Sequence, residues 1–143
     1  MKIIGFNIEE KDNAAAAFAI RQKVFVEEQK VNREEEYDEH EYSASHYLVL
    51  IDEQPVATAR WRFTDKGIKL ERFSVLPEFR NQGIGSALVN HILTTVTPHQ
   101  KLIYLHAQVA AMNVYARNGF EAEGELFYEA NIPHYKMIYS LSK

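Results

Sequence analysis

The chain has no cysteine, which excludes disulfide bonds, thiolate metal sites and cysteine nucleophiles. No apolar run approaches the roughly 20 residues needed to span a bilayer, so we expect no membrane partner. Residues 1–10 alternate in polarity and lack the apolar core of a secretory signal peptide. The histidines show neither H-x-x-x-H nor H-E-x-x-H spacing, so no metal is predicted. These absences favour a cytoplasmic protein by default.

The sequence also has no surplus of positive charge. Its formal net charge is −4, which argues against a non-specific nucleic-acid partner, although a local basic pocket stays compatible with it. Apolar residues make up 46% and charged residues 25% of the 143, so a real core is expected and disorder is not. Because no internal repeat, linker or low-complexity region is visible, residues 1–143 are predicted to form a single domain.

Hydrophobic periodicity predicts a mixture of helices and strands. Strands are predicted at residues 2–8, 46–51, 57–64, 68–75, 102–105, 123–128 and 134–141, and helices at residues 14–28, 84–96 and 109–118. Asp12 or Asn13 can cap the first helix, and Gly119 can end the last one. The order β-α-β-β-β-α-β-α-β-β indicates an α/β fold in which a mixed sheet is flanked by helices.

Two charged segments have roles that the sequence leaves open. In the third predicted strand Trp61 and Phe63 face one way, toward the expected core. Arg60 and Arg62 face the other way and either line a pocket or are ordinary surface charges. Residues 32–42 are dense in carboxylates and are expected to form a loop or an irregular helical turn. This acidic run is either a solvated face or a means of attracting a cationic ligand.

Residues 75–88 join a strand to a helix through a turn that contains Gly83 and Gly85. Backbone N–H groups converge at such a turn and the helix dipole adds partial positive charge, so the turn can hold a phosphate. Arg80 can add a charge-assisted hydrogen bond. The R-x-x-G-x-G spacing is neither the dinucleotide fingerprint nor a P-loop. Many junctions of this kind bind nothing, so the glycines alone leave ligand binding open.

Two motifs resemble those of the GNAT superfamily of N-acetyltransferases. The first is similar to motif A and reads Val75-x-Pro77-x-x-Arg80-x-x-Gly83-x-Gly85. The second, N-V-Y-A-R-N-G-F at residues 113–120, is similar to a loose form of motif B. The motifs stand in the expected order, each in a strand–helix context. A pair of this kind is much more specific than either motif alone.

Further stretches resemble the ElaA-like branch of this superfamily, at residues 71–75, 106–108 and 132–137. That branch also has an acidic stretch where residues 34–41 lie. One position departs, because many members have glycine where this chain has Asn81. Asparagine tolerates a left-handed backbone better than most residues, so the turn is expected to keep its shape. The resemblance implies a GNAT-like fold, with a mostly antiparallel central sheet splayed between its fourth and fifth main strands.

The resemblance implies that acetyl-coenzyme A is the co-substrate. Its pantetheine arm is expected in the splayed gap, bonded to the backbone of the fourth strand like an added strand. Its pyrophosphate is expected on the glycine turn. The implied cofactor-binding residues are Phe73, Ser74, Val75, Arg80, Asn81, Gln82, Gly83, Ile84, Gly85, Ser86, Asn113 and Arg117.

The resemblance also implies catalytic roles. Tyr115 matches the superfamily's general acid, which protonates the leaving thiolate, and the alternative is an aromatic side chain that only packs a helix on the sheet. The backbone near Val75 is the expected donor to the tetrahedral oxyanion. A base must also take a proton from the acceptor amine. The candidates for the base are Glu71, His106 and His134.

Each candidate base has a structural alternative. Glu71 alternates with Phe73 and Val75, so its side chain is expected on their face of the strand; the alternative is an ion pair with a neighbouring arginine. His106 is otherwise a hydrogen-bonded core histidine. His134 is otherwise a surface residue on an edge strand.

The predicted function is transfer of an acetyl group from acetyl-coenzyme A to a primary amine of a small molecule or peptide. The alternative is a coenzyme A-binding sensor or interaction module without catalysis, and a plain nucleotide-binding domain is a weaker third candidate. The sequence leaves the acceptor open. A homodimer formed through the last strands is compatible with the pattern.

Overall fold

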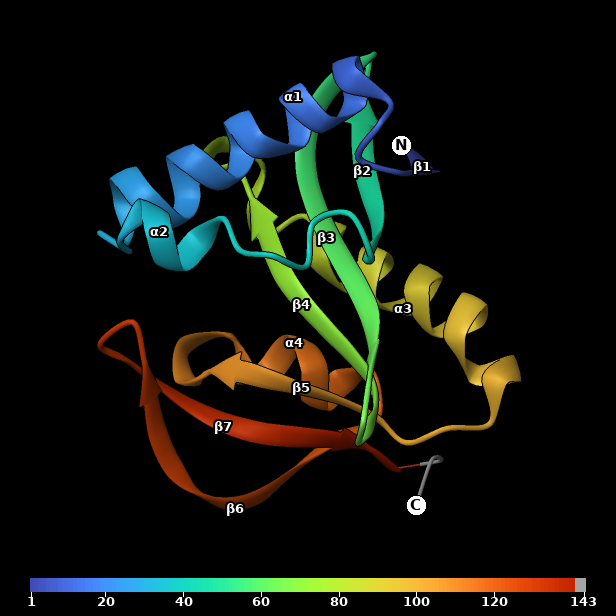
Figure 1. Ribbon diagram of the computed structural model, residues 1–143, viewed down its shortest axis with the longest axis vertical. Coiled ribbons are helices and arrows are strands. Elements are labelled where there is room, and N and C mark those ends of the chain that lie inside the picture. Colours follow the sequence, from blue (N-terminus) through green and yellow to red (C-terminus); the bar gives the residue numbers. More distant parts are fainter. Residues whose placement is uncertain (141–143) are drawn as a thin grey trace.

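The computed structural model describes residues 1–140 and contains one seven-stranded sheet with helices on both faces (Figure 1). The strands are β1 (Lys2–Phe6), β2 (Ser45–Ile51), β3 (Gln54–Thr64), β4 (Gly67–Val75), β5 (Ile103–Gln108), β6 (Phe120–Glu129) and β7 (Ile132–Tyr139). The helices are α1 (Lys11–Arg21), the π-helix η1 (Gln22–Glu28), α2 (Arg33–Glu36), α3 (Ile84–Val96) and α4 (Met112–Arg117). Short 3-10 turns are η2 (Pro77–Phe79), η3 (Thr97–His99) and η4 (Val109–Ala111).

The predicted order of elements and the mixed α/β class are confirmed, including the irregular helical turn in the acidic run. The start of the first helix differs from the prediction. α1 begins at Lys11 with Glu10 at the N-cap position, so the expected caps Asp12 and Asn13 lie inside its first turn. The last predicted strand is β7, and residue 141 at its predicted end lies outside the described residues.

The sheet has the order β1-β2-β3-β4-β5-β7-β6, and β4 runs parallel to β5. This parallel pair is short, with Cα partners Ile68–Ile103, Lys69–Tyr104 and Leu70–Leu105. Beyond it β4 stays paired with β3 up to Val75, and β5 stays paired with β7 up to Gln108. The two strands therefore diverge, and β5, β7 and β6 turn away from the rest of the sheet (Figure 1). The predicted splay between the fourth and fifth strands is confirmed.

Apolar side chains fill both faces of the sheet. α3 lies on one face, where Leu88 packs in the same cluster as Leu70 of β4. α1 lies on the other face, where Ala17 packs with Leu48 of β2. Within residues 1–140 no helix is long and apolar enough to cross a membrane, and the histidine and acidic side chains form no cluster suited to a metal ion.

Side chains alternate between the two faces of β3 as predicted, but the burial of Phe63 and of Arg60 differs from the prediction. Trp61 is buried in the α3-side core, as expected. Phe63 shares that face yet is 52% exposed, because it lies close to the hairpin end of β3, where its ring meets the edges of Trp61 and His99. Arg60, on the opposite face, is 0% exposed and is not a surface charge.

Arg60 is the centre of a buried ion network. Its guanidinium donates to Asp38 Oδ2 at 2.7 Å, to Glu41 Oε1 at 2.8 Å and, through Nε, to Glu71 Oε2 at 2.7 Å. A buried charge is tolerated when it is paired and fully hydrogen-bonded. These three carboxylates meet that condition and hold the acidic run against β3 and β4.

The acidic run is therefore a solvated face only in part, because Glu34, Glu35 and Glu39 are exposed while its other carboxylates are held within the protein. Glu36 and Glu41 are 3% and 7% exposed, and both accept hydrogen bonds from the buried Arg21 of α1, at 2.6 Å and 2.8 Å. Because these carboxylates are neutralised within the protein, they are not available to attract a cationic ligand. The run instead fixes α2 on the sheet beside β4.

We predict that this network makes the free energy of unfolding depend on pH in the acid range. Burial alone would raise the pKa of Glu71, but Arg60, Lys69 and Arg62 lower it from 4.5 to about 2. The stabilisation from this carboxylate, roughly 3 kcal/mol from the size of the shift, is complete above about pH 5 and is lost as the pH falls toward 2. Glu71→Gln should therefore lower the free energy of unfolding at pH 7, and its deficit should shrink toward pH 2 in urea titrations. Parallel curves for variant and wild type would contradict this account.

Candidate active site

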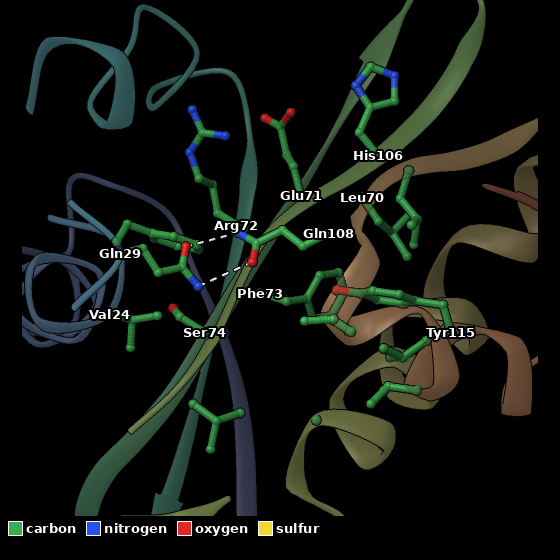
Figure 2. A pocket seen from close by; sticks show the side chains of 18 of the residues that line it. Val24, Gln29, Leu70, Glu71, Arg72, Phe73, Ser74, His106, Gln108 and Tyr115 are labelled. Atoms are coloured by element: carbon green, nitrogen blue, oxygen red, sulfur yellow. Dashed lines mark hydrogen bonds between the residues drawn. The ribbon is translucent and has the colours of Figure 1, made fainter. Parts of the chain in front are cut away.

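A pocket of about 560 Å³ opens where β4 and β5 diverge. Its walls come from η1 and α2 on one side, β4 and β5 in the middle, and the turn before α3 together with α4 on the other. Figure 2 shows side chains from these segments converging on it. Of the residues predicted from the sequence, the pocket brings together Glu71, Phe73, Ser74, Val75, Arg80, Asn81, Gly83, Ile84, Gly85, Ser86, His106, Tyr115, Arg117 and His134.

Two predicted cofactor residues lie elsewhere. Asn113 is exposed on α4 and is not among the residues that line the pocket. Gln82 is also exposed, and its amide donates a long hydrogen bond of 3.4 Å to the carbonyl of Glu78. Neither residue therefore lines the gap, although the backbone of Gln82 still belongs to the glycine turn.

A β-bulge in β4 shapes the middle of the pocket. Ser74 pairs with Thr58 and Glu71 pairs with Arg60, so the single residue Ala59 faces two residues of β4. One of these, Arg72, has a left-handed backbone with φ of 61°. An extra residue of this kind bends the strand and re-aims its side chains.

The bulge overturns the prediction that Glu71 and Phe73 share a face. Phe73 packs its ring on Tyr115 at 5.6 Å, on the α4 side of the sheet. Glu71 points to the opposite side, where its carboxylate accepts hydrogen bonds from Arg60 at 2.7 Å and Arg62 at 2.9 Å. With its pKa near 2, this carboxylate is ionised at neutral pH and has little affinity for a proton. The structure thus contains the ion pair that was the alternative for Glu71.

The glycine turn has the shape that the motif requires. Asn81 and Gly83 both have left-handed backbones, with φ of 62° and 79°, so asparagine does keep the turn where glycine is common. Gly83 is the N-cap of α3, and a Cβ atom built on it meets no atom within 4 Å. The space beside Gly83 is therefore open, and the first residues of α3 line the pocket, as an anion site at a helix N-terminus needs. Asn118 supports the turn by donating to Ser86 Oγ at 2.8 Å.

The guanidinium of Arg80 is already hydrogen-bonded to a carboxylate of the protein. Its two terminal nitrogens each donate to Glu28 of η1 at 2.7 Å, and its Nε donates to the carbonyl of Val75 at 3.0 Å. This bidentate pair ties the end of η1 to the end of β4. A phosphate would have to share the guanidinium with Glu28 or displace that carboxylate.

Tyr115 lies at the wall of the pocket beside α3. It is 8% exposed, and its ring packs against Phe73 at 5.6 Å and Phe120 at 6.2 Å. Its hydroxyl end points toward the neighbouring Phe73 (Figure 2). Burial raises the pKa of Tyr115 above its ordinary value, so the phenol keeps its proton at neutral pH. Tyr115 therefore packs against aromatic neighbours and also carries a protonated hydroxyl, so it meets the structural requirement of both predicted roles.

The two candidate histidines share one carboxylate. His106 Nδ1 lies 2.7 Å from Glu129 Oε1, and His134 Nε2 lies 3.9 Å from Glu129 Oε2. His134 is buried, and its Nδ1 lies 2.6 Å from the carbonyl of Ile132, so it is not an exposed edge residue. The hydrogen bond with His106 is the main cause of the lowered pKa of Glu129.

Sequence reasoning missed a pair of amides that crosses the gap. Gln29 Nε2 donates to Gln108 Oε1 at 3.2 Å, and Gln108 Nε2 donates back to Gln29 Oε1 at 2.9 Å (Figure 2). Glu129 was missed as well. No motif marks these residues, and the two glutamines are 79 positions apart, so only the fold brings them together.

Ser74 is the one buried side chain, among the residues described, whose polar atom has no hydrogen-bond partner. It is 4% exposed and lines the pocket next to Val24 of η1 (Figure 2). Its cross-strand neighbour Thr58 differs, since that hydroxyl donates to the carbonyl of Tyr47 at 2.7 Å. An unsatisfied buried hydroxyl costs free energy unless a ligand satisfies it.

Known proteins are similar to this chain in sequence and in fold. Residues 8–141 match the family model of the acetyltransferase (GNAT) domain. YjcF of Bacillus subtilis, an uncharacterized N-acetyltransferase, is 37% identical over 124 residues, which span 85% of this chain and 89% of YjcF. The crystal structure of Escherichia coli ElaA superposes with a TM-score of 0.87 at 27% identity, covering 96% of this chain and 99% of ElaA.

A more distant structure shows the fold alone. A GNAT family acetyltransferase from Elizabethkingia anophelis, crystallised with acetyl-coenzyme A bound, has a TM-score of 0.64 at 14% identity. The match covers 96% of this chain and 94% of that protein.

We predict opposite effects of removing the two neighbouring hydroxyls. Ser74→Ala removes an unsatisfied group and should leave the free energy of unfolding unchanged or raise it by up to about 1 kcal/mol. Thr58→Val removes a satisfied hydrogen bond from the same face and should lower that free energy by about 1 kcal/mol. Urea unfolding of the ligand-free proteins measures both. Destabilisation by Ser74→Ala equal to that of Thr58→Val would show that the hydroxyl has a partner in solution.

Proposed function

The chain belongs to the GNAT acetyltransferase family, and we propose that it moves an acetyl group from acetyl-coenzyme A to a primary amine by direct transfer in a ternary complex. The observation that carries this proposal is the pocket itself, in which an open helix N-terminus stands next to the free edge of β4. An anion site and a strand edge side by side suit a ligand made of a diphosphate and an amide-containing arm. The acetyl-coenzyme A bound by the Elizabethkingia relative is such a ligand.

The coenzyme would lie along the α3 side of the gap. Its pyrophosphate would accept hydrogen bonds from the amides around Gly83 and Gly85. Its pantetheine arm would pair with the edge of β4 between Phe73 and Val75, which β5 leaves unpaired. A side chain on Gly85 would meet Val114 and Val75 at 3.9 Å, an ordinary contact, whereas one on Gly83 would enter the open space.

The chemistry needs three groups around the thioester. A neutral amine attacks the thioester carbonyl, the new C–N bond forms and the C–S bond breaks. Tyr115 would give the leaving thiolate its proton, which its raised pKa keeps in place until the transition state. A backbone N–H near Val75 would stabilise the oxyanion.

The proton of the amine needs a base on the other side of the gap. Glu71 fits poorly, because two arginines hold it ionised and its pKa is near 2. His106 and His134 both line the pocket. A neutral imidazole takes a proton readily near neutral pH, so we assign the base to this pair rather than to Glu71.

Release of free thiol from acetyl-coenzyme A, measured with a panel of primary amines, tests the proposed function. Turnover with at least one amine is expected. Tight binding of acetyl-coenzyme A without turnover on any amine would favour the non-catalytic coenzyme A-binding module. Stronger thermal protection by ATP or NAD than by acetyl-coenzyme A would favour a nucleotide-binding domain.

We predict that Gly83→Ala weakens acetyl-coenzyme A binding at least tenfold, because its methyl group enters the space in front of the α3 amides. Gly124→Ala is the matched control. Gly124 has a similar left-handed φ of 87° and equally open surroundings, but it lies in β6 away from the pocket. Both variants carry about 1 kcal/mol of backbone strain. Calorimetric titration should separate them, and equal affinities would count against the anion site.

We also predict that Tyr115→Phe lowers kcat about 100-fold, in the range expected for loss of a general acid, while binding of acetyl-coenzyme A changes less than threefold. The phenyl ring keeps the contacts with Phe73 and Phe120, so packing is preserved. Steady-state kinetics and titration of the coenzyme measure the two effects. Equal losses in turnover and binding would assign Tyr115 a packing role instead.

A further inference from the structure

We propose that Glu129 is a positioning residue that fixes His106 as the general base. This inference rests on the proposed acetyl transfer. The hydrogen bond of 2.7 Å between His106 Nδ1 and Glu129 Oε1 links β5 to the end of β6 and lies in the wall of the pocket. No sequence motif pointed to Glu129.

The bond determines which nitrogen of His106 carries the proton. A carboxylate can only accept hydrogen bonds, so the neutral ring must hold its hydrogen on Nδ1. Nε2 then has a free lone pair, and among residues 1–140 it has no hydrogen-bond partner. In general, a group hydrogen-bonded to one ring nitrogen fixes the orientation and the tautomer of a catalytic imidazole. Glu129 thus prepares Nε2 to receive a proton, directly or through water.

The position of His106 suits a base that acts opposite Tyr115. His106 is the first residue of β5 beyond the last parallel pair, Leu70 with Leu105. It lies on the same face as Glu71, whereas Tyr115 lies on the α4 side with Phe73 (Figure 2). An acid and a base on opposite sides of the gap match a reaction in which the thiolate gains a proton and the amine loses one.

His134 is placed less well for this role. Its Nδ1 must carry a hydrogen because the nearest atom is the carbonyl of Ile132 at 2.6 Å. Its basic Nε2 therefore faces the second oxygen of Glu129, at 3.9 Å. Phe127 packs on both rings, at 5.0 Å from His106 and 5.8 Å from His134, and limits their rotation. The carboxylate of Glu129 thus lies between two imidazoles. Only the imidazole of His106 has a ring nitrogen, Nε2, that is not directed at this carboxylate or at a carbonyl.

Among residues 1–140, Glu129 is the carboxylate that contacts the His106 ring directly, and the other charged groups nearby are paired with one another. Lys69 and Glu71 of β4 form an ion pair at 3.4 Å, and Lys136, the cross-strand partner of His106, pairs with Glu123 at 3.7 Å. The remaining titratable neighbours are Tyr104, whose ring centroid lies 6.1 Å from that of His106, and His134, on the far side of the carboxylate. When the amine proton reaches Nε2, the imidazolium forms beside an anionic Glu129. The ring side chain is 26% exposed, so it can return the proton to water.

Glu129→Gln tests the proposal because it keeps size and removes charge. We expect kcat to fall about tenfold, a part of the 10²–10⁴ that a general base contributes. The acid limb of the pH profile of kcat/KM should move to lower pH in this variant, since an imidazolium formed at His106 loses its anionic partner. Binding of acetyl-coenzyme A should stay unchanged. In a His106→Gln background the same substitution should have no further effect on turnover.

Glu123→Gln is the matched control. Glu123 lies on the same strand, is 52% exposed against 44% for Glu129, and also pairs with a cation. It should leave kcat and the pH profile unchanged. An unshifted acid limb in Glu129→Gln, or equal shifts in both variants, would overturn the proposal.

A readout without turnover separates this inference from the proposed function. The ¹⁵N shifts of His106 in the wild-type protein should report the Nδ1–H tautomer, and Glu129→Gln should mix the tautomers. A wild-type Nε2–H tautomer would overturn the positioning role even in an active enzyme. A protein with the Nδ1–H tautomer that binds acetyl-coenzyme A but acetylates no amine would instead refute the acetyl transfer.

Discussion

The buried guanidinium of Arg60 is the constraint on which the rest of the site depends. A charge with no exposure must be surrounded by acceptors, and here Asp38 and Glu41 from the acidic run and Glu71 from β4 supply them. This requirement pulls a loop that is remote in sequence onto the sheet and fixes it beside the pocket. It also removes Glu71 from proton transfer, because a carboxylate held this way stays ionised far below neutral pH. The network thus holds the acidic run in place as one wall of the pocket. It also leaves the two histidines, rather than Glu71, as candidates for the general base.

The second determinant is the single extra residue in β4. Without the bulge, the side chains of Glu71 and Phe73 would lie on the same face of β4. The strand could then not present a charged side chain on one face and an aromatic side chain on the other. With it, Phe73 turns to Tyr115 and the α4 side, while Glu71 turns to the arginines. In the proposed reaction, the same strand would therefore contact the thioester on one side and the amine on the other. Because β5 separates from β4 just before the bulge, both surfaces reach the same gap.

The two sides of the gap are built differently. The side proposed for the coenzyme comes from one continuous segment, in which the end of β4, the left-handed turn at Asn81 and Gly83, and the start of α3 follow each other in the chain. The side proposed for the acceptor is assembled from the end of η1, β5 and the β6–β7 hairpin, which supply Gln29, His106 and Glu129. The first side therefore depends on local sequence, whereas the second depends on contacts between segments that are distant along the chain.

By itself the sequence determined what depends on neighbours along the chain: the order of strands and helices and the left-handed turn tolerated by Asn81. The splay was expected only from the resemblance of the motifs to a known family. Alternation and turn geometry are local properties, so they can be read from the residues in order. Only the tertiary structure decided which charges are buried, on which face Glu71 lies, and that Glu129 holds His106. Those facts arise from register shifts and from contacts between distant segments. One inserted residue reverses a strand's faces, and no local pattern carries that information.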